Sequence, residues 1–218
     1  AGTHFTNVTI EGQPSGPSLS GGTTGYHYFD NLQVIGYHPV QGINLPSGEY
    51  TDSVFEIGPS GNTIKGTANL SANGTYVFDN VTVVGNDEGG GGLFGMGDDL
   101  EVTITGSTFL VNGDGPAVHI RAAASVLIED SEIAATGISG SVPLIYIGYY
   151  WDRLSASRIA EVTIDGNTIE TDASGAVGIS TEYAGVDAGP YTVTNNTLTN
   201  AILKLKTNDI ASGNVLLP

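Results

Sequence analysis

Ile104-Thr105-Gly106-Ser107-Thr108-Phe109 is the stretch of sequence that decides the fold, because its pattern returns along the chain. The pattern is an aliphatic residue, a polar residue, two turn-forming residues, a second polar residue and a second apolar residue. It recurs as IEDSEI at 128–133, IDGNTI at 164–169 and VTNNTL at 193–198, and more loosely as IASGNV at 210–215. One such unit cannot bury its apolar side chains alone, so the repeated units must stack on one another.

Within each repeat the residues alternate as they do in a β-strand. Val102 and Ile104 point to one face, while Thr103 and Thr105 point to the other. The turn pair suits a bend that visits the left-handed region of backbone space, after which the next apolar residue faces inward again. We therefore expect two strands joined by a bend in each repeat, with apolar side chains lining a shared interior.

Related segments extend this pattern over the rest of the chain. A further apolar segment follows the repeats after a short connection, as in AVHI at 117–120 and LIYI at 144–147. The amino-terminal half carries a variant of the repeat, as FTNVTI at 5–10, FDNLQV at 29–34 and FDNVTV at 78–83. The spacing between repeats is irregular, which insertions explain because loops project laterally from a stack without disturbing its core.

The repeated segment resembles the parallel β-helix repeats of the pectate-lyase-like superfamily, through the pattern Ile-x-[Gly/Asp/Asn]-[Ser/Asn]-x-Ile. The carboxyl-terminal half matches it better than the amino-terminal half. The resemblance implies a right-handed coil, three sheets and asparagines stacked in the turns. Asn167 and Asn196 stand where that stack would lie, whereas Ser107 and Ser131 depart from it, so an incomplete stack is expected.

We therefore expect an all-β fold, a single-stranded right-handed parallel β-helix (β-solenoid) of about eight or nine coils with lateral loop insertions. One domain should cover residues 1–218, with less regular coils over 1–99 and regular coils over 100–215. A β-sandwich is the competing fold, since short strands at regular spacing also suit it. Sandwich strands seldom repeat one segment so often, which favours the β-helix.

Composition limits the partners and the location. The net charge of −17 repels nucleic acid and anionic lipid, and no apolar run is long enough to insert into a membrane. The chain begins with Ala1, so we expect that a secretory leader has been removed and that the protein is extracellular or at the cell surface. Acceptor sequences for N-glycosylation support a glycoprotein. They lie at Asn7, Asn69, Asn73, Asn80 and Asn195.

Two groups of carboxylates are candidate cation ligands. Glu129 and Asp165 hold the same place in successive repeats, where outward side chains on strands ~4.8 Å apart nearly touch. Such a pair can bind a cation or share a proton. A glycine-rich loop carries four more acids, which can converge on calcium through oxygen ligands. These are Asp87, Glu88, Asp98 and Asp99. Solvated surface acids and a plain lateral loop are the simpler interpretations. The sequence implies no cofactor, and calcium is the candidate metal.

An aromatic insertion is the most distinctive candidate contact site. It holds Tyr149, Tyr150, Trp151 and Arg153, and aromatic residues beside an arginine form sugar platforms or protein-contact anchors. A loop folded back over its own sheet is the alternative. His119 should face outward and lacks ligand spacing for a metal. No signature of a catalytic site is present, so we expect no enzymatic activity.

Three functions fit these features. The first is a structural subunit of an extracellular filament, sheath or surface layer, which self-associates through uncapped β-helix ends and lateral loops, because an open end coil exposes unpaired backbone and apolar side chains. The second is a polysaccharide-binding or polysaccharide-degrading β-helix that contacts a cell-surface glycan. The third is an adhesin or receptor-binding module. The sequence favours the first, with the chain itself as the partner.

Overall fold

The fold consists of stacked parallel strands. The computed structural model describes residues 2–11, 25–37, 43–57, 68–70, 73–86, 92–148, 159–184 and 189–218. These residues form strands and turns without a helix, and their strand pairings are parallel from the first pair to the last. The prediction of an all-β parallel stack is confirmed, and a sandwich of antiparallel layers is excluded.

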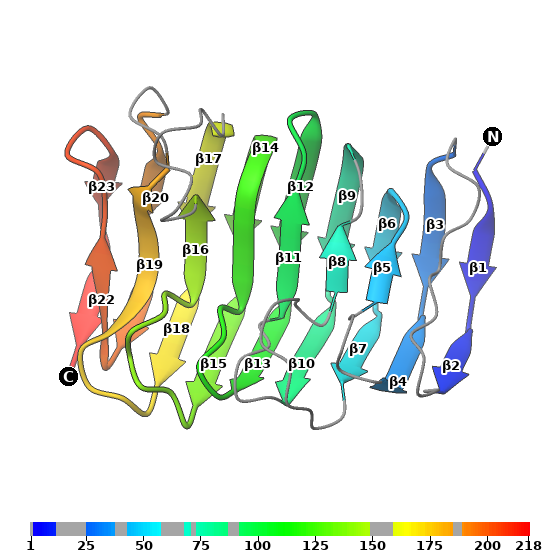
Figure 1. The fold of residues 1–218 in the computed structure, drawn as a ribbon, viewed down its shortest axis with the longest axis horizontal. Helices are drawn as coiled ribbons and strands as arrows, with labels where there is room; N and C mark the ends of the chain where they lie inside the picture. Colours follow the sequence, from blue (N-terminus) through cyan, green and yellow to red (C-terminus); the bar gives the residue numbers. More distant parts are fainter. Residues whose placement is uncertain are drawn as a thin grey trace.

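Two hydrogen-bonded sheets contain the strands of the described residues, and Figure 1 shows these strands side by side along the stack. The nine-stranded sheet, here sheet B, consists of β2 (Thr9–Glu11), β4 (Gln33–Tyr37), β7 (Val54–Ile57), β10 (Thr82–Asn86), β13 (Thr108–Asn112), β15 (Glu132–Thr136), β18 (Thr168–Thr171), β21 (Thr197–Thr199) and β24 (Val215–Leu217). The other sheet has 15 strands and divides into two arms at the long strand β14 (Val118–Glu129).

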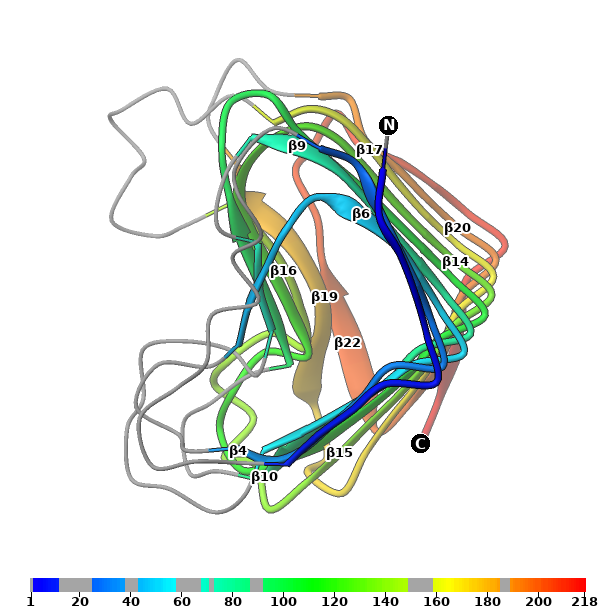
Figure 2. The same cartoon turned by 90° about the vertical axis from the view of Figure 1, so that its right-hand side faces the viewer.

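The two arms are named sheet A and sheet C. Sheet A runs through β1 (His4–Thr6), β3 (His27–Asp30), β6 (Gly48–Thr51), β9 (Gly74–Asp79), β12 (Leu100–Thr105), the end of β14, β17 (Ile159–Asp165), β20 (Thr192–Thr194) and β23 (Ile210–Ser212). Sheet C runs through β5 (Ile43–Leu45), β8 (Ala68–Leu70), β11 (Leu93–Met96), the start of β14, β16 (Ile145–Gly148), β19 (Ala176–Tyr183) and β22 (Ala201–Lys204). Figure 2 looks along the stack and shows the three sheets around one interior.

The turn between sheets A and B repeats one backbone conformation. Each such turn holds a residue with a positive φ, between 49° and 68°, which non-glycine residues other than Asn and Asp rarely adopt. These residues are Asn7, Asn31, Asp52, Asn80, Gly106, Asp130, Gly166, Asn195 and Gly213. The predicted left-handed bend is confirmed, and its regularity explains why the first residue of each turn pair in the sequence repeat is Gly, Asn or Asp.

From Ser107 onward, the residue after each bend links neighbouring coils through its side chain. The Ser107 amide donates to Ser131 Oγ (3.1 Å), the Ser131 amide to Asn167 Oδ1 (3.0 Å), and the Asn167 amide to Asn196 Oδ1 (3.0 Å). The Asn196 amide continues to Asn214 Oδ1 (3.0 Å). The asparagine stack is incomplete, as expected, but the chain of hydrogen bonds continues through Ser107 and Ser131, because a serine hydroxyl accepts the same backbone hydrogen bond as an asparagine amide oxygen. We call these five residues the turn ladder.

The interior changes character along the stack. In sheet A the inward row begins with rings, and Phe29, Tyr50 and Phe78 stack with centroids 4.7 and 5.3 Å apart. Beyond Phe78 the side chains of the same row are aliphatic, and they become smaller toward the carboxyl-terminal end. The remaining members of the row are Ile104, Ile128, Ile164, Val193 and Ala211. The buried residues form one apolar cluster that spans the coils, as the shared interior predicted.

Candidate functional site

The carboxylate pair Glu129 and Asp165 lies on neighbouring strands in register, as predicted. Both residues are half-buried. Asp165 Oδ1 accepts hydrogen bonds from Thr194 Oγ1 and from Asn195 Nδ2 (2.8 Å), so this carboxylate already bonds to the following coil. No group of three or more His, Cys, Asp or Glu in the described part of the chain is placed to hold a metal ion. Cation binding by the pair stays a prediction.

Half of the glycine-rich loop site lies outside the described residues, since Asp87 and Glu88 fall there. Asp98 and Asp99 are exposed in the turn before β12. Asn73 Nδ2 donates to Asp99 Oδ2 (3.3 Å), and the Asp99 amide donates to Asn73 Oδ1 (3.3 Å). These bonds tie the turn to the coil before it, and calcium binding there stays a prediction.

The aromatic insertion with Tyr149, Tyr150, Trp151 and Arg153 also lies outside the described residues. Its role as a contact site stays a prediction.

The glycosylation candidates differ in exposure. Asn7, Asn73, Asn80 and Asn195 are exposed, whereas Asn69 on β8 is 5% exposed. Asn80 Nδ2 donates to Asp52 Oδ1 (2.5 Å), as Asn195 does to Asp165. Accessible acceptor side chains therefore occur at turns of the stack, and the Asn69 side chain is the one that the fold withholds from solvent.

The outward face of sheet C carries a row of rings that the sequence did not single out. His119 on β14 stacks on Tyr146 of β16 with centroids 4.6 Å apart, and it meets the edge of Phe94 of β11 at 5.3 Å. Tyr183 of β19 continues the row, 5.9 Å from Tyr146. His119 does face outward as predicted, yet neighbouring groups bury much of its ring. This row gathers side chains from strands that are far apart in sequence.

The environment of His119 keeps its ring neutral. Burial is the main cause that lowers the pKa of His119, the hydrogen bond to the Gly148 carbonyl opposes it, and the nearby Arg121 charge adds to the lowering, so that the pKa is about 4. That bond joins Nε2 to the carbonyl oxygen at 3.2 Å, so Nε2 carries the proton.

Stability should therefore depend on pH through His119. A histidine in the unfolded chain titrates near pH 6.5. The contribution of the neutral His119 ring to the free energy of unfolding is therefore complete above that pH and is lost as the pH falls toward 4. We expect a loss of ~1–3 kcal/mol across this window. Urea unfolding at pH 7 and pH 5 measures it. His119→Phe keeps a ring against Tyr146 and should remove this part of the pH dependence, because the substitution leaves every other titratable group in place. An unchanged pH dependence in the variant would contradict the assignment.

An open groove lies at the carboxyl-terminal end of sheet C, with a volume of about 850 Å³. Its wall includes Glu182, Tyr183, Lys204 and Lys206. Two of the six Lys and Arg residues of the chain, Lys204 and Lys206, lie in this wall two positions apart. The sequence gave no signal that they face Glu182 and Tyr183, because that proximity arises only when β19 and β22 pair.

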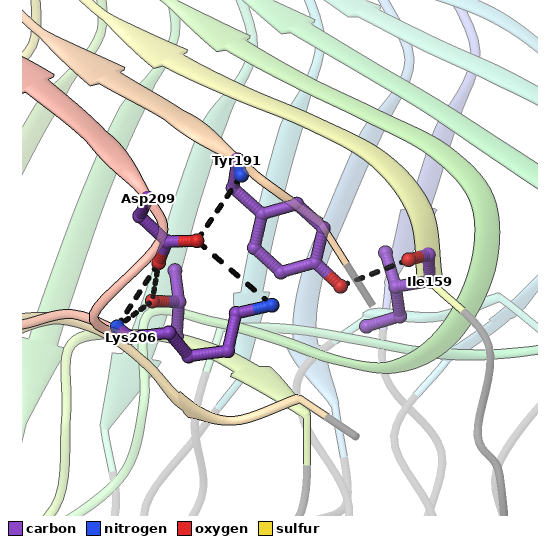
Figure 3. A network of polar contacts seen from close by, with 5 residues as sticks. Ile159, Tyr191, Lys206 and Asp209 are labelled. Carbon is purple, nitrogen blue, oxygen red and sulfur yellow. Dashed lines mark hydrogen bonds and ion pairs between the residues drawn. The ribbon is translucent and has the colours of Figure 1, made fainter. Parts of the chain in front are cut away.

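A polar network closes part of the carboxyl-terminal end of the stack (Figure 3). Asp209 holds an inward position, and its fully buried carboxylate accepts the Tyr191 amide (3.1 Å) and the Lys206 amide (3.1 Å). Lys206 Nζ lies 3.8 Å from Asp209 Oδ1 and 3.9 Å from the centroid of the Tyr191 ring. The Tyr191 hydroxyl donates to the Ile159 carbonyl (2.8 Å). The lysine and the carboxylate thus cover the last buried tyrosine.

The surroundings shift the pKa values of Lys206 and Tyr191 in opposite directions. Burial lowers the pKa of Lys206, while the Asp209 carboxylate opposes that shift. Burial and the same carboxylate raise the pKa of the Tyr191 phenol. The network is therefore an ion pair without net charge that lies over an uncharged phenol ring. This arrangement suits a cover over the end of the stack better than a reaction centre. The expectation of uncapped ends is refined here, because polar groups cover Tyr191 at this end, while the residues of β23 itself stay exposed.

Apolar side chains nevertheless reach the surface at both ends of the stack. At the amino-terminal end, Phe5 is 39% exposed, and a cavity of about 240 Å³ opens between the first coils. Its lining residues are Phe5, Val8, Ile10, His27, Phe29, Leu32 and Pro46. At the carboxyl-terminal end, Leu216 is 55% exposed although its row is buried in earlier coils. The two chain ends lie at opposite ends of the stack (Figure 1).

Comparisons with known proteins give no relative from which a function can be read. The described residues contain no helix with the length and apolar character that crossing a membrane requires. No protein-family model, no curated protein and no solved structure matches the chain.

Proposed function

We propose that the chain is a structural subunit of an extracellular assembly and that it associates with copies of itself through its end coils. The observation that carries the proposal is the exposure of inward-row side chains at both ends, Phe5 at 39% and Leu216 at 55%. The same rows are buried in the coils between, where Phe78 and Leu198 are 0% exposed. Open strand edges with an apolar interior behind them favour association.

The distribution of charge supports association at the ends rather than along the sides. All Asp and Glu residues except Glu11 and Asp209 lie between residues 30 and 187. The net charge of −17 therefore resides on the middle of the stack, where side-by-side contact would bring like charges together. The end coils are the least repulsive surfaces that the chain offers to a copy of itself.

The finer architecture belongs to the same proposal. We infer a right-handed coil, and we assign one turn of that coil to each strand of the nine-stranded sheet B, within the eight or nine turns expected from the repeats. A right-handed stack with regular ends can add further copies without a change of geometry, which suits a filament, a sheath or a surface layer. The structural role is proposed in place of a catalytic one.

Self-association should respond to a charge at an end coil. Leu216→Lys and Phe5→Asp would each leave an unpaired charge in an apolar contact, so we expect each to weaken association by roughly tenfold or more. Sedimentation velocity over a range of protein concentrations measures this. Leu110→Lys is the matched control, because Leu110 is 39% exposed in the middle of sheet B and should leave association unchanged. Equal association of all four proteins would contradict the proposal.

A glycan-binding module is the second candidate, and the groove on sheet C favours it. The groove joins an aromatic ring, Tyr183, to Lys204 and to the polar residues Thr207 and Asn208. Rings and hydrogen-bonding side chains of this kind bind sugars through stacking and polar contacts. If the chain binds a soluble polysaccharide while it stays monomeric, that result would favour this candidate over the structural one. An adhesin role would need the same groove or the aromatic insertion and has no separate support.

A further inference from the structure

We propose that the contact between copies is a head-to-tail, parallel and in-register continuation of the stack, in which β23 and β24 of one copy pair with β1 and β2 of the next. This inference rests on the proposed end-to-end association and specifies its geometry. The strands at both ends belong to the same two sheets, with β1 and β23 in sheet A and β2 and β24 in sheet B. Each of these strands pairs in parallel on one side, to β3, β20, β4 or β21.

The existing register defines which residues would face each other. Val193 pairs with Ala211 at one end of the sheet A inward row, and Phe5 pairs with Phe29 at the other. Continuing the row places Ala211 of one copy against Phe5 of the next. In sheet B, Leu198 pairs with Leu216 and Ile10 pairs with Val34, so Leu216 would meet Ile10.

The two end surfaces have complementary shapes in this register. Phe5 stacks on Phe29 with centroids 5.0 Å apart, so its outer face projects beyond the first coil. Ala211 is the smallest side chain of the same row and leaves room for that ring at the other end. The cavity of about 240 Å³ at the amino-terminal end is lined by Phe5 and Ile10, where Leu216 of the neighbouring copy would enter. Apolar burial of this kind drives association.

A head-to-head contact lacks these matches. Two copies related by a two-fold axis would bring Phe5 against Phe5 and would run their edge strands antiparallel, unlike every pairing in the described stack. That contact also closes as a dimer, whereas head-to-tail contacts leave one free end of each kind and extend.

The turn ladder makes the junction weaker than the contacts between the coils that the ladder joins. Within the chain the Asn196 amide donates to Asn214 Oδ1, but the next position in register is Val8 of the neighbouring copy. A valine side chain has no acceptor for the Asn214 amide. Copies should therefore separate before the coils unfold, which gives a reversible assembly.

Cysteine cross-linking tests the register, because the chain contains no cysteine of its own. Thr6 on β1 and Ser212 on β23 are the first and last residues of one outward-facing row, and both are exposed. Continuation of the stack makes Ser212 of one copy the neighbour of Thr6 of the next. Purified Thr6→Cys and Ser212→Cys proteins, one of them isotope-labelled, are mixed and treated with a short thiol-reactive cross-linker. Mass spectrometry should find the mixed dimer as the main cross-linked species and should find little dimer from either variant alone.

The outcomes separate this inference from the proposed function. Thr51→Cys mixed with Ser212→Cys is the matched control, since Thr51 shares the outward row but both its neighbours belong to its own chain. Cross-linking of Thr6→Cys with itself would overturn the head-to-tail geometry. Concentration-dependent growth of the unmodified chain without the mixed dimer would overturn the register and leave end-to-end association standing. An unmodified chain that stays monomeric would overturn both.

Discussion

Replacement of Phe78 by alanine should destabilise the fold by ~3–5 kcal/mol, the usual cost of deleting a buried ring. Phe78 is 0% exposed and stacks on Tyr50 with a centroid distance of 5.3 Å and an interplanar angle of 12°. Its neighbour on the other side of the row is Ile104, whose shorter side chain cannot move into the space. The deletion therefore leaves a cavity that the rigid spacing of the coils keeps open.

Urea unfolding followed by circular dichroism measures the loss, and hydrogen exchange locates it. In a stack each coil contacts only its neighbours, so amides of β6, β9 and β12 should lose protection while those of β18 and β21 keep most of theirs. Leu110→Ala is the control, because this side chain points outward and is 39% exposed. A Phe78→Ala protein as stable as the control would show that the inward row does not form a packed interior.

Replacement of Asn196 by alanine should cost ~2–4 kcal/mol, through buried polar groups rather than through lost apolar contact. Asn196 is 0% exposed, and its Oδ1 accepts the Asn167 amide. Its Nδ2 donates to the carbonyls of Ile164 (3.0 Å) and Thr194 (2.9 Å). Alanine leaves an amide and two carbonyls without these partners in the interior of a turn.

A serine at the same position should recover roughly half of that loss, since a serine hydroxyl already serves in the ladder. Ser131 Oγ accepts the Ser107 amide and donates to the Glu129 carbonyl (2.9 Å). Asn195→Gly controls for the turn itself, because glycine adopts the φ of 56° freely and the change removes an exposed hydrogen bond to Asp165 rather than buried ones. Thermal or urea unfolding should rank the proteins with Asn195→Gly most stable, then Asn196→Ser, then Asn196→Ala. Equal stability of the serine and alanine variants would contradict the ladder.

The sequence predicted the parts of the fold that depend on local pattern. The alternation around Ile104 and Ile164 predicted strands, and the turn pairs predicted a left-handed bend, because both follow from short-range backbone chemistry. The register of Glu129 with Asp165 also followed, since equivalent residues of a repeat must meet when the repeats stack. Each of these inferences needed only the repeat itself.

Features that combine different coils could not be predicted in the same way. The chain of hydrogen bonds through Ser107 and Ser131 depends on a common distance between turns rather than on a common residue type. His119 and Tyr146 hold the same place in the segments AVHI and LIYI, but their residue types differ, so the pattern alone did not indicate that their rings stack. Asp209 resembled a surface acid, and only the fold shows that it turns inward beneath Lys206.

The central claim is that coils share one interior and that the end coils present this interior to a further copy. Electron microscopy of the purified chain over a range of concentrations tests it most directly. The account predicts unbranched rods of constant width whose length increases with concentration, with strands stacked across the rod axis at a spacing of ~4.8 Å. Short particles of one fixed length at every concentration, or particles that grow in width while their length stays constant, would contradict it.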